Sequence, residues 1–452
     1  MLEAPVVIIG AGIAGLAAAV TISRAGLPVV VLEARNRIGG RIFTQLDPSS
    51  GFAIEFGPEF IHGQPPEIWQ PLQASGAAIT EVDGRNWCVS RGKLSPCEFL
   101  SQVDSILDSM DDSHPDESFL GFLERRFPNR SRDGELDEAK RRAIAYVSGF
   151  NAADPALVGV HWLVAGMRAE ETHQGDRAFR SENGYADLLQ IFQRQISGLN
   201  VRIQTGTVVE RIEWKPGAAR VIACANNTEN TFRAQHILIT LPVSLLKASD
   251  GLGAVKFIPA LPREKTASLD HIEMGKVIRI VLRFRHRFWD AISPPAGSSR
   301  GGNKTLSDMR FLFSEDESFP TWWTTLQKKE PVITGWAPFR SAETLSGRSQ
   351  STITQRALYA LSRSLGVNMR DLEGSLDASY VHDWQTDPFS RGAYSYGKVG
   401  AVEAQRELGS PVENTLFFAG EATDTSGNNG TVHGAIASGY RTAGEIIQAS
   451  RR

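Results

Sequence analysis

The chain has 452 residues, with 48 lysines and arginines against 51 aspartates and glutamates, for a net charge of −3. This balance gives no excess of positive charge for binding nucleic acid or an anionic membrane surface. Hydrophobic residues at 41% and charged residues at 22% exclude a disordered chain and are typical of a globular enzyme of about three domains, or of two with one interrupted by the other. Its three cysteines, Cys88, Cys97 and Cys224, are too few for a disulfide framework and lack metal-binding spacing, which favours a reducing, cytoplasmic location.

Residues 4–23 carry no charge and would be long enough to span a bilayer. Only Met1, Leu2 and Glu3 precede them, so there is no basic region of the kind that begins a signal peptide. The stretch also contains three glycines at a spacing with a mechanism of its own. We therefore expect a buried strand, a tight turn and a buried helix, and no membrane segment.

The first 35 residues follow the order strand, glycine turn, helix, strand. Residues 6–9 and 29–32 are short β-branched runs, as expected for strands buried on both faces, and residues 13–25 have helical period. Glu33 stands at the carboxyl end of the second strand. This βαβ unit predicts the start of a doubly wound α/β sheet.

The rest of the chain gives clear elements only in places. Residues 98–142 are charged and helix-prone, interrupted by Pro115 and Pro128. Further strands are predicted at 201–225, with a turn at 214–217, and at 232–241, 277–284 and 415–418. Further helices are predicted at 352–365 and 432–450.

Gly10, Gly12 and Gly15 form a GxGxxG motif between the first strand and the helix. The first glycine permits the turn, the second lets the backbone approach a pyrophosphate, and the third lets the helix pack on the strand. The free N–H groups at the start of the helix attract phosphate. Glu33 follows Gly10 by 23 residues, where a carboxylate can accept hydrogen bonds from ribose hydroxyls, so we expect a dinucleotide here rather than a plain turn.

Two further glycine-rich segments suit a flavin. After Glu33 the sequence continues as Ala34, Arg35 and then a Gly-Gly-Arg that ends in Gly40 and Arg41, where an arginine can neutralise phosphate. Near the other end, residues 418–421 follow a strand and residues 428–435 open the last helix. A helix N-terminus stabilises the negative charge that a flavin ring gains on reduction, although an ordinary capped helix would have the same pattern.

Together the two ends of the chain resemble the flavin-containing amine oxidase family, which includes polyamine oxidases, monoamine oxidases and histone lysine demethylases, and the motifs are most similar to those of polyamine oxidases. The resemblance is strong over about the first 65 and last 70 residues and thin between them. It rests on the stretches VVIIGAGIAGLAAA, LEARNRIGGR, EFGPEFIHG, MGKVIRIVLRF, RGAYSYG and LFFAGEATDTSGNNGTVHGAIASGYRTAGEII.

The resemblance implies that the cofactor is FAD. Its adenosine end would meet the glycine motif, Glu33 and the backbone of Val209, and its diphosphate and ribityl chain would lie near Arg41 and Glu421. The residues implied to contact FAD are Gly10, Gly12, Ala14, Gly15, Glu33, Ala34, Arg35, Gly40, Arg41, Val209, Gly420, Glu421, Thr431 and Val432. Some relatives carry a cysteine bonded to the flavin where this chain has Ala393, so the FAD is expected to be noncovalent.

The resemblance also implies catalytic positions. Lys276 would hold a water beside the flavin, unless it is an exposed strand lysine. Tyr394 would form one wall of an aromatic cage, and Thr431 takes the place of the second wall, which is often tyrosine. Glu59 and His62 lie where amino-acid oxidases carry an arginine, and a carboxylate there suits a cationic substrate. The alternative is that Glu59 forms an internal salt bridge and that His62 is a core histidine.

The nine histidines show no metal-ligand spacing, so no metal is predicted. We expect an α/β fold in which a Rossmann-type FAD-binding domain (residues 1–80, 190–260 and 385–452) is interleaved with a substrate-binding domain of mixed sheet and helices (residues 81–189 and 261–384). The active site would lie in the cleft between the two domains.

The leading hypothesis is an FAD-dependent oxidase of a polyamine or another multiply charged amine, with hydride transfer to the flavin, reduction of O2 to H2O2 and hydrolysis of the imine. Its partners would be the small-molecule amine and O2. The alternatives are a monoamine or alkaloid amine oxidase, a flavin desaturase or dehydrogenase that reacts poorly with oxygen, and a non-enzymatic flavoprotein whose second domain binds a partner. The sequence leaves the amine, the cleaved C–N bond and the oligomeric state open.

Overall fold

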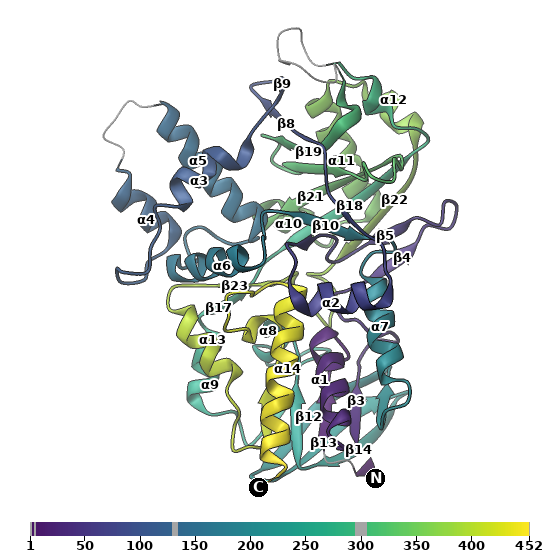
Figure 1. Cartoon of the computed structure of the whole chain (residues 1–452), viewed down its shortest axis with the longest axis vertical. Helices are drawn as coiled ribbons and strands as arrows, with labels where there is room; N and C mark the ends of the chain where they lie inside the picture. The colour runs from purple at the N-terminus through teal and green to yellow at the C-terminus, as the bar shows by residue number, and fades with distance from the viewer. Residues whose placement is uncertain (1, 4–5, 129–133, 294–304, 452) are drawn as a thin grey trace.

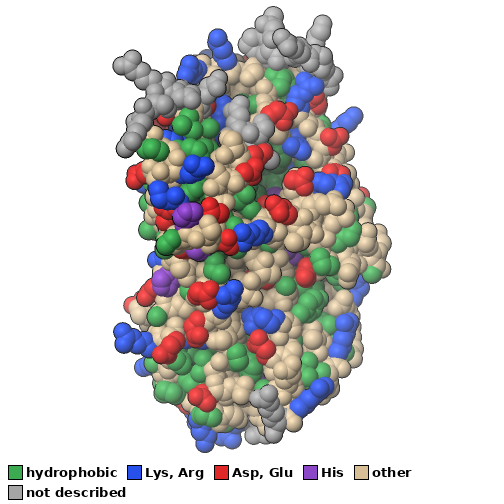
Figure 2. Space-filling model, turned by 60° about the vertical axis from the view of Figure 1, so that its left-hand side comes forward, with side chains coloured by type: hydrophobic (Ala, Val, Ile, Leu, Met, Phe, Trp, Pro, Cys, Tyr) green, Lys and Arg blue, Asp and Glu red, His purple; other side chains and the backbone are tan. Residues whose placement is uncertain are grey.

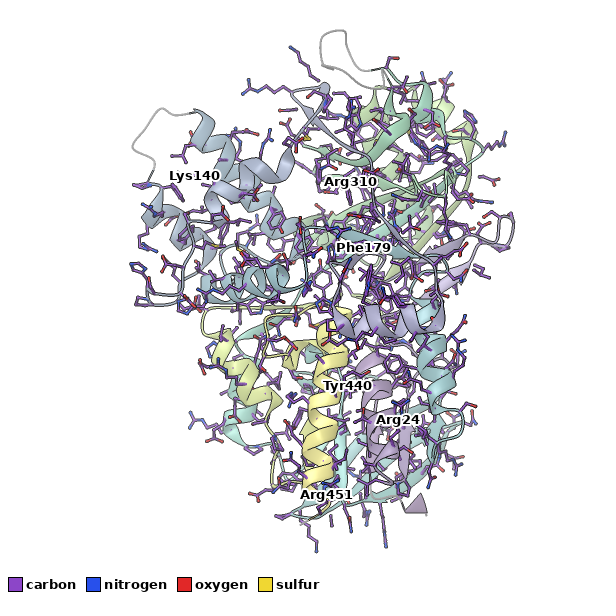
Figure 3. All side chains as sticks on the ribbon, in the orientation of Figure 1. Arg24, Lys140, Phe179, Arg310, Tyr440 and Arg451 are labelled. Atoms are coloured by element: carbon purple, nitrogen blue, oxygen red, sulfur yellow. A yellow bond between two sulfur atoms is a disulfide. The ribbon has the colours of Figure 1, made fainter. Side chains whose placement is uncertain are left out.

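The computed structural model describes residues 2–3, 6–128, 134–293 and 305–451, with the side chains of residues 2–3, 99–102 and 134–135 excluded. Figure 1 shows a lower half built around a parallel sheet, which holds both chain termini at its lower end, and an upper half in which helices stand beside a second large sheet. Phe179, labelled in Figure 3, lies where the halves meet and packs edge to face on Trp69, with ring centroids 4.8 Å apart.

Five parallel strands form the central sheet of the lower half. Their order is β11 (Val201–Gln204), β3 (Val29–Leu32), β2 (Val6–Ile9), β15 (His236–Ile239) and β24 (Leu416–Phe418). With α1 (Ile13–Arg24) between β2 and β3, the predicted βαβ unit is confirmed, and so is the α/β, Rossmann-type fold class.

Helices cover one face of this sheet and a second sheet covers the other. Helix α1 packs against α14 (Val432–Ala449), and α2 (Pro66–Ser75) and α7 (Ala186–Ile196) complete the helical layer. The contact between α1 and α14 is close because Gly439 has no side chain: a Cβ there would lie 2.4 Å from the carbonyl oxygen of Ala14. This packing fixes the starts of both helices beside the same edge of the sheet.

The covering sheet has the order β1 (Leu2–Glu3), β14 (Thr228–Ala234), β13 (Ala218–Ala225), β12 (Thr207–Lys215) and β16 (Lys256–Ile258). The turn predicted at 214–217 joins β12 to β13, as expected. The single strand predicted at 232–241 is wrong, because β14 pairs in the covering sheet and β15 in the parallel sheet, so the chain changes layers at Gln235. Apolar side chains of both sheets, among them Val7 and Ile212, fill the space between them.

A seven-stranded mixed sheet forms one part of the upper half (Figure 1). Its order is β22 (Leu376–Asp383), β18 (Val277–Phe284), β21 (Val332–Pro338), β20 (Thr321–Thr324), β19 (Met309–Ser314), β8 (Arg85–Ser90) and β9 (Lys93–Pro96). Its apolar core includes residues of α10 (Phe339–Leu345), α11 (Gln350–Leu365) and α12 (Met369–Ser375). The strand predicted at 277–284 is confirmed as β18, and all of its residues are buried.

Four helices form the other part of the upper half: α3 (Phe99–Leu107), α4 (Phe119–Arg126), α5 (Gly134–Phe150) and α6 (Val160–Thr172). Apolar side chains such as Phe122, Val147 and Leu163 form a separate core between them. The helices predicted in 98–142 are confirmed, and Pro115 and Pro128 lie outside them, as expected of residues that end a helix.

Short elements complete the chain and join these parts. Strand β10 (Ala178–Ser181) pairs with β6 (Ile61–His62) and β7 (Ile79–Glu81), β4 (Thr44–Leu46) with β5 (Ala53–Glu55), and β17 (Ile272–Met274) with β23 (Ser395–Gly397). The remaining helices are α8 (Val243–Leu246), α9 (Arg263–Leu269), α13 (Ala401–Gly409) and the 3-10 helices η1 (Phe288–Ala291), η2 (Leu306–Asp308) and η3 (Glu421–Thr423). The proposed domain boundaries stay predictions.

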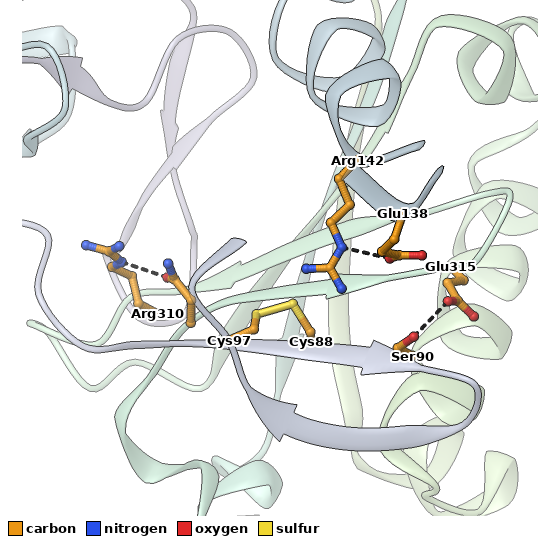
Figure 4. The surroundings of a disulfide bond; sticks show 8 residues. Cys88, Ser90, Cys97, Glu138, Arg142, Arg310 and Glu315 are labelled. Carbon is orange, nitrogen blue, oxygen red and sulfur yellow. Dashed lines mark hydrogen bonds and ion pairs between the residues drawn. A yellow bond between two sulfur atoms is a disulfide. The ribbon is translucent and has the colours of Figure 1, made fainter. Parts of the chain in front are cut away.

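Cys88 of β8 and Cys97, the residue after β9, form a disulfide (Figure 4). Their pairing differs from the expectation of a reducing compartment, where structural disulfides are rare. The β8–β9 hairpin brings the two cysteines together. Cys88 lies opposite Ser95, and the N–H of Cys97 donates to the carbonyl of Asn86 at 3.1 Å. Cys224 is a free thiol.

The uncharged stretch at the start of the chain folds as β2, a glycine turn and α1, as predicted. Among the residues that the structure describes, no helix combines the length and the apolar character needed to cross a bilayer.

Candidate active site

A cavity of about 1160 Å³ runs from the glycine turn of the lower half to the helices and sheet of the upper half. Ligand cavities are commonly about 300–1,000 Å³, so this one has room for a cofactor and a substrate together. All of the residues implied to contact FAD line it except Gly15. Tyr394, Glu59, His62 and Thr431 also line it, whereas Lys276 does not.

The glycine turn forms one end of this cavity. Gly10 has φ = +103°, which favours glycine, and a Cβ there would lie 2.5 Å from the hydroxyl of Thr240. A Cβ on Gly15 would lie 2.2 Å from the carbonyl oxygen of Gly10, so this glycine allows helix α1 to approach the strand. Gly12 has no atom within 4 Å of its Cβ position, which leaves its backbone open to a ligand.

Glu33 organises the same end of the cavity. Its carboxylate accepts hydrogen bonds from the N–H of Ala11 at 2.8 Å and from the N–H of Arg35 at 2.9 Å. Its backbone joins it to the segment before Val209, because the N–H of Thr207 donates to the Glu33 carbonyl at 2.8 Å. The carboxylate, the glycine turn and Val209 thus surround one space, as the resemblance implies for the adenosine end.

Arg41 and Glu421 form an ion pair across the cavity, at 2.8 Å. Arg41 also donates to the carbonyl of Ala393 at 2.9 Å. Glu421 accepts hydrogen bonds from the N–H and hydroxyl of Ser395 and from the N–H of Gly430 at 3.0 Å. The pair therefore fixes the chain on both sides of Tyr394 and the approach to α14.

Helix α14 begins at the middle of the cavity. Thr431 is its N-cap: its hydroxyl accepts from the N–H of Gly434 at 3.0 Å and donates to the carbonyl of Asn428 at 2.6 Å. Thr431 and Val432 line the cavity, so the partial positive charge of the helix start faces it. Thr431 thus helps to position α14, and it offers no second aromatic wall opposite Tyr394.

Tyr394 begins an aromatic wall that continues into the helical part. Its hydroxyl donates to the carbonyl of Phe150 at 2.6 Å. The ring of Phe150 stacks on Tyr146, with centroids 5.3 Å apart and planes at 9°, and it meets the ring of His62 edge to face at 5.3 Å. Sequence reasoning missed Phe150 and Tyr146, because they lie on α5, where the resemblance is thin.

Glu59 is held inside an ion-pair cluster. Its carboxylate pairs with Arg180 at 2.7 Å and with Arg279, and it accepts from the indole N–H of Trp323 at 2.9 Å. Burial raises the pKa of Glu59, but the two guanidinium groups outweigh this effect and hold the pKa below its usual value. Two arginines thus already neutralise this carboxylate, which fits the alternative of an internal salt bridge, and the role as a cation anchor stays a prediction.

The side chain of Lys276 fits the alternative of an exposed lysine, and its role beside the flavin stays a prediction. Its ammonium pairs with Glu343 at 2.8 Å, and both side chains are nearly half exposed, outside the cavity. The cation that β18 presents to the cavity is Arg279, three residues later, which is buried and donates to the carbonyl of Gly57 at 2.9 Å. Arg279 lies within the motif MGKVIRIVLRF, but the sequence does not show which face of β18 meets the cavity.

Three histidines line the cavity near Tyr394: His62, His173 and His433. Burial lowers the pKa of His62 to about 4 and that of His433 to about 3, with a smaller contribution from His173 in each case. Both are therefore neutral at pH 7. Among the described residues no group of three or more His, Cys, Asp or Glu side chains is arranged to hold a metal ion.

The comparisons with known proteins agree with this site. The sequence profile of the family described as flavin containing amine oxidoreductase matches residues 13–110 and 102–447. Since these ranges include most of the chain, it belongs to that family.

Similar curated proteins include lysine-specific histone demethylase 1 homolog 3 of Arabidopsis thaliana, 27% identical over 99% of this chain and 30% of that protein. Polyamine oxidase 2 of the same plant is 26% identical over 97% of this chain and 87% of that protein. The chain thus spans less than a third of the demethylase.

Solved structures with the same fold include putrescine oxidase bound to putrescine, with a TM-score of 0.79 and 22% identity over 99% of each chain. Cyclohexylamine oxidase from Brevibacterium oxydans IH-35A has a TM-score of 0.76 and 20% identity over 99% of this chain and all of that one.

The residues of the cavity fit FAD, which is the cofactor. The open backbone at Gly12, the two helix starts and the carboxylate of Glu33 suit a diphosphate and a ribose. Residue 393 is alanine, and the residues that line the cavity include no cysteine, so they offer no thiol for a covalent flavin bond.

We predict that Glu33→Ala weakens FAD binding by about 10- to 100-fold, the scale of one charge-assisted hydrogen bond at ~1.5–3 kcal/mol. Glu33→Gln is the matched control, because it keeps one acceptor for the Ala11 N–H and should lose less affinity. Fluorescence titration of the apoprotein with FAD measures both, with circular dichroism to verify folding. If Glu33→Ala binds FAD as tightly as the wild type does, the carboxylate of Glu33 does not contact the cofactor.

We predict that Arg279→Met lowers the turnover of the amine-oxidase reaction at least about tenfold, or ~1.4 kcal/mol in barrier, because Gly57 and Glu59 lose a buried donor. Lys276→Met should change turnover by less than about twofold, since an exposed pair contributes little. Steady-state kinetics on holoenzymes of equal FAD content compares the two. A larger loss of turnover in Lys276→Met than in Arg279→Met would indicate that Lys276, rather than Arg279, acts at the site.

The low pKa of His62 predicts a loss of stability in acid. The unfolded chain binds a proton near pH 6.5 and the folded one only near pH 4, so stability falls as the pH decreases through this window. At pH 5 the loss from His62 alone is roughly 2 kcal/mol. Urea unfolding at about pH 7.5 and about pH 5 should therefore show a smaller acid loss in His62→Gln than in wild type. Equal losses in the two proteins would mean that His62 titrates normally.

Proposed function

We propose that this enzyme oxidises the neutral amino group of a small amine that carries a second, positively charged group, such as a diamine or polyamine, with O2 as the electron acceptor. The single observation that carries the proposal is the character of the cavity beside Tyr394. It is aromatic, and Glu59, a deeply placed carboxylate at that end, is already paired with two arginines.

This end of the cavity suits an uncharged amine. His62 and His433 are neutral at pH 7, and Arg180, Arg279 and Glu59 together carry a net positive charge. A protonated amine would be repelled there, whereas its deprotonated form can lie against the rings. Oxidation next to nitrogen needs this form, because the nitrogen lone pair must stabilise the positive charge that develops on the neighbouring carbon.

The chain's own groups orient the amine and exclude water. The hydrogen bond from Tyr394 to the Phe150 carbonyl fixes one ring, and Trp323 and Phe60 border the same space, with centroids 5.5 Å apart. When bound, FAD supplies the two-electron acceptor for hydride from the carbon next to nitrogen, O2 then takes up the electrons to give H2O2, and the imine hydrolyses in water.

Polyamine oxidases among the relatives and putrescine oxidase among the fold neighbours support a di- or polyamine. Other relatives are histone demethylases, and another fold neighbour is cyclohexylamine oxidase. The cytoplasmic location expected from the cysteine count stays a prediction, and the Cys88–Cys97 bond counts against it.

We predict that anaerobic addition of putrescine, spermidine or spermine bleaches the flavin absorbance, and that air restores the colour with release of H2O2. A benzylic amine should react more slowly, and an amino acid should not react, because Arg180 and Arg279 are already paired with the carboxylate of Glu59. Stopped-flow spectroscopy and a peroxide assay measure the two half-reactions.

Preferential bleaching by the benzylic amine would favour a monoamine oxidase. Bleaching without peroxide would favour a dehydrogenase that uses another acceptor. No bleaching by any amine would overturn the proposal as a whole.

A further inference from the structure

The carboxylates that line the cavity differ in whether the protein satisfies them. Glu33 accepts from two backbone N–H groups, Glu421 pairs with Arg41, and Glu59 pairs with two arginines. Glu170, near the end of α6, lines the same cavity, yet within the described part of the chain its carboxylate makes no hydrogen bond and no ion pair. A half-buried carboxylate without a partner is costly, and a cationic ligand would remove that cost.

Glu170 lines the same cavity as the aromatic wall. The wall begins at His62 and Phe150 beside Tyr394 and continues with Tyr146 through two successive ring contacts of 5.3 Å. Tyr146, Glu170 and Asp104 all line this cavity, and the negative charges of the two carboxylates add to burial in raising the pKa of Tyr146. An aliphatic chain can therefore run along the rings from the reacting end to the carboxylates.

The charges around Glu170 leave it available to a ligand. Arg310, on the sheet side of the cavity, donates to Asn86 at 3.0 Å and interacts mainly with Asp83, Glu98 and Glu81, so it does not neutralise Glu170 (Figure 4). Arg168, two residues earlier on α6, pairs with Asp112. Figure 2 shows further acidic side chains grouped over the middle of the face on which the helices lie.

We infer that Glu170 is the anchor for the distal ammonium of the substrate, with Tyr146 as a flat ring against that cation and Asp104 as a second, more exposed carboxylate. The inference rests on the proposed function. It assigns recognition of the second positive charge of the substrate to α6, because Glu59 is neutralised by two arginines. A carboxylate and an aromatic face together bind an ammonium well. The distance between the reacting end and Glu170 then selects the length of the substrate.

The test compares α,ω-diamines of increasing chain length with monoamines in which a methyl group replaces the second amino group. Glu170→Gln should lower kcat/KM for the preferred diamine by about 10- to 100-fold, and change that for the matched monoamine by less than about threefold. It should also flatten the dependence on chain length. Glu170→Asp should recover part of the loss for a longer diamine.

Glu171→Gln is the matched control, because Glu171 is the exposed neighbour on the same helix and lines the same cavity. It should leave the diamine preference unchanged. A second readout is thermal: Glu170→Gln should melt at or above the wild-type temperature, since it removes an unpaired carboxylate, and it should lose the stabilisation that added diamine gives the wild type.

An equal loss for diamine and monoamine, or a lowered melting temperature, would make Glu170 a structural residue and overturn the inference. The same holds if Glu171→Gln reproduces the effect. These outcomes differ from failure of the proposed function, in which the wild type oxidises no amine of either series.

Discussion

The ion pair between Arg41 and Glu421 is the interaction on which the active site depends, because it joins segments 380 residues apart across one cavity. Arg41 follows the glycine turn that receives the cofactor, and Glu421 holds the chain on both sides of Tyr394. Both partners are largely buried, so the loss of either one would leave a charge without compensation. The cofactor-binding end of the cavity and the aromatic wall that begins at Tyr394 are therefore fixed relative to each other.

The division of charge along the cavity follows from this arrangement. The end beside Tyr394 contains neutral histidines and a carboxylate neutralised by two arginines, and the helical end contains the unpaired Glu170. An amine that must react uncharged and be recognised by a second charge would find both requirements in one cavity. The net charge of −3 gives no hint of this division, which comes only from the fold.

The sequence predicted the parts of the site whose function depends on local geometry. Gly10, Gly12 and Glu33 belong to one βαβ unit, so their spacing along the chain fixes their positions in space. The roles predicted for Glu59 and Lys276 could not be judged from the sequence, because their ion-pair partners are distant in it: Arg180 and Arg279 for Glu59, and Glu343 for Lys276. Glu170 and the rings of α5 carry no local motif, so only tertiary packing reveals them.

The most direct test of this account is a double-mutant cycle on the central ion pair, with Arg41→Gln, Glu421→Gln and the double variant. The measured quantities are the FAD dissociation constant and the rate of anaerobic flavin bleaching by a diamine. If the ion pair joins the cofactor site to the aromatic wall, each single variant should impair both FAD binding and bleaching. The double variant should then be little worse than either single variant, with a coupling energy of at least about 1 kcal/mol. Additive effects, or a Glu421→Gln variant that binds FAD normally and bleaches at the wild-type rate, would contradict the account.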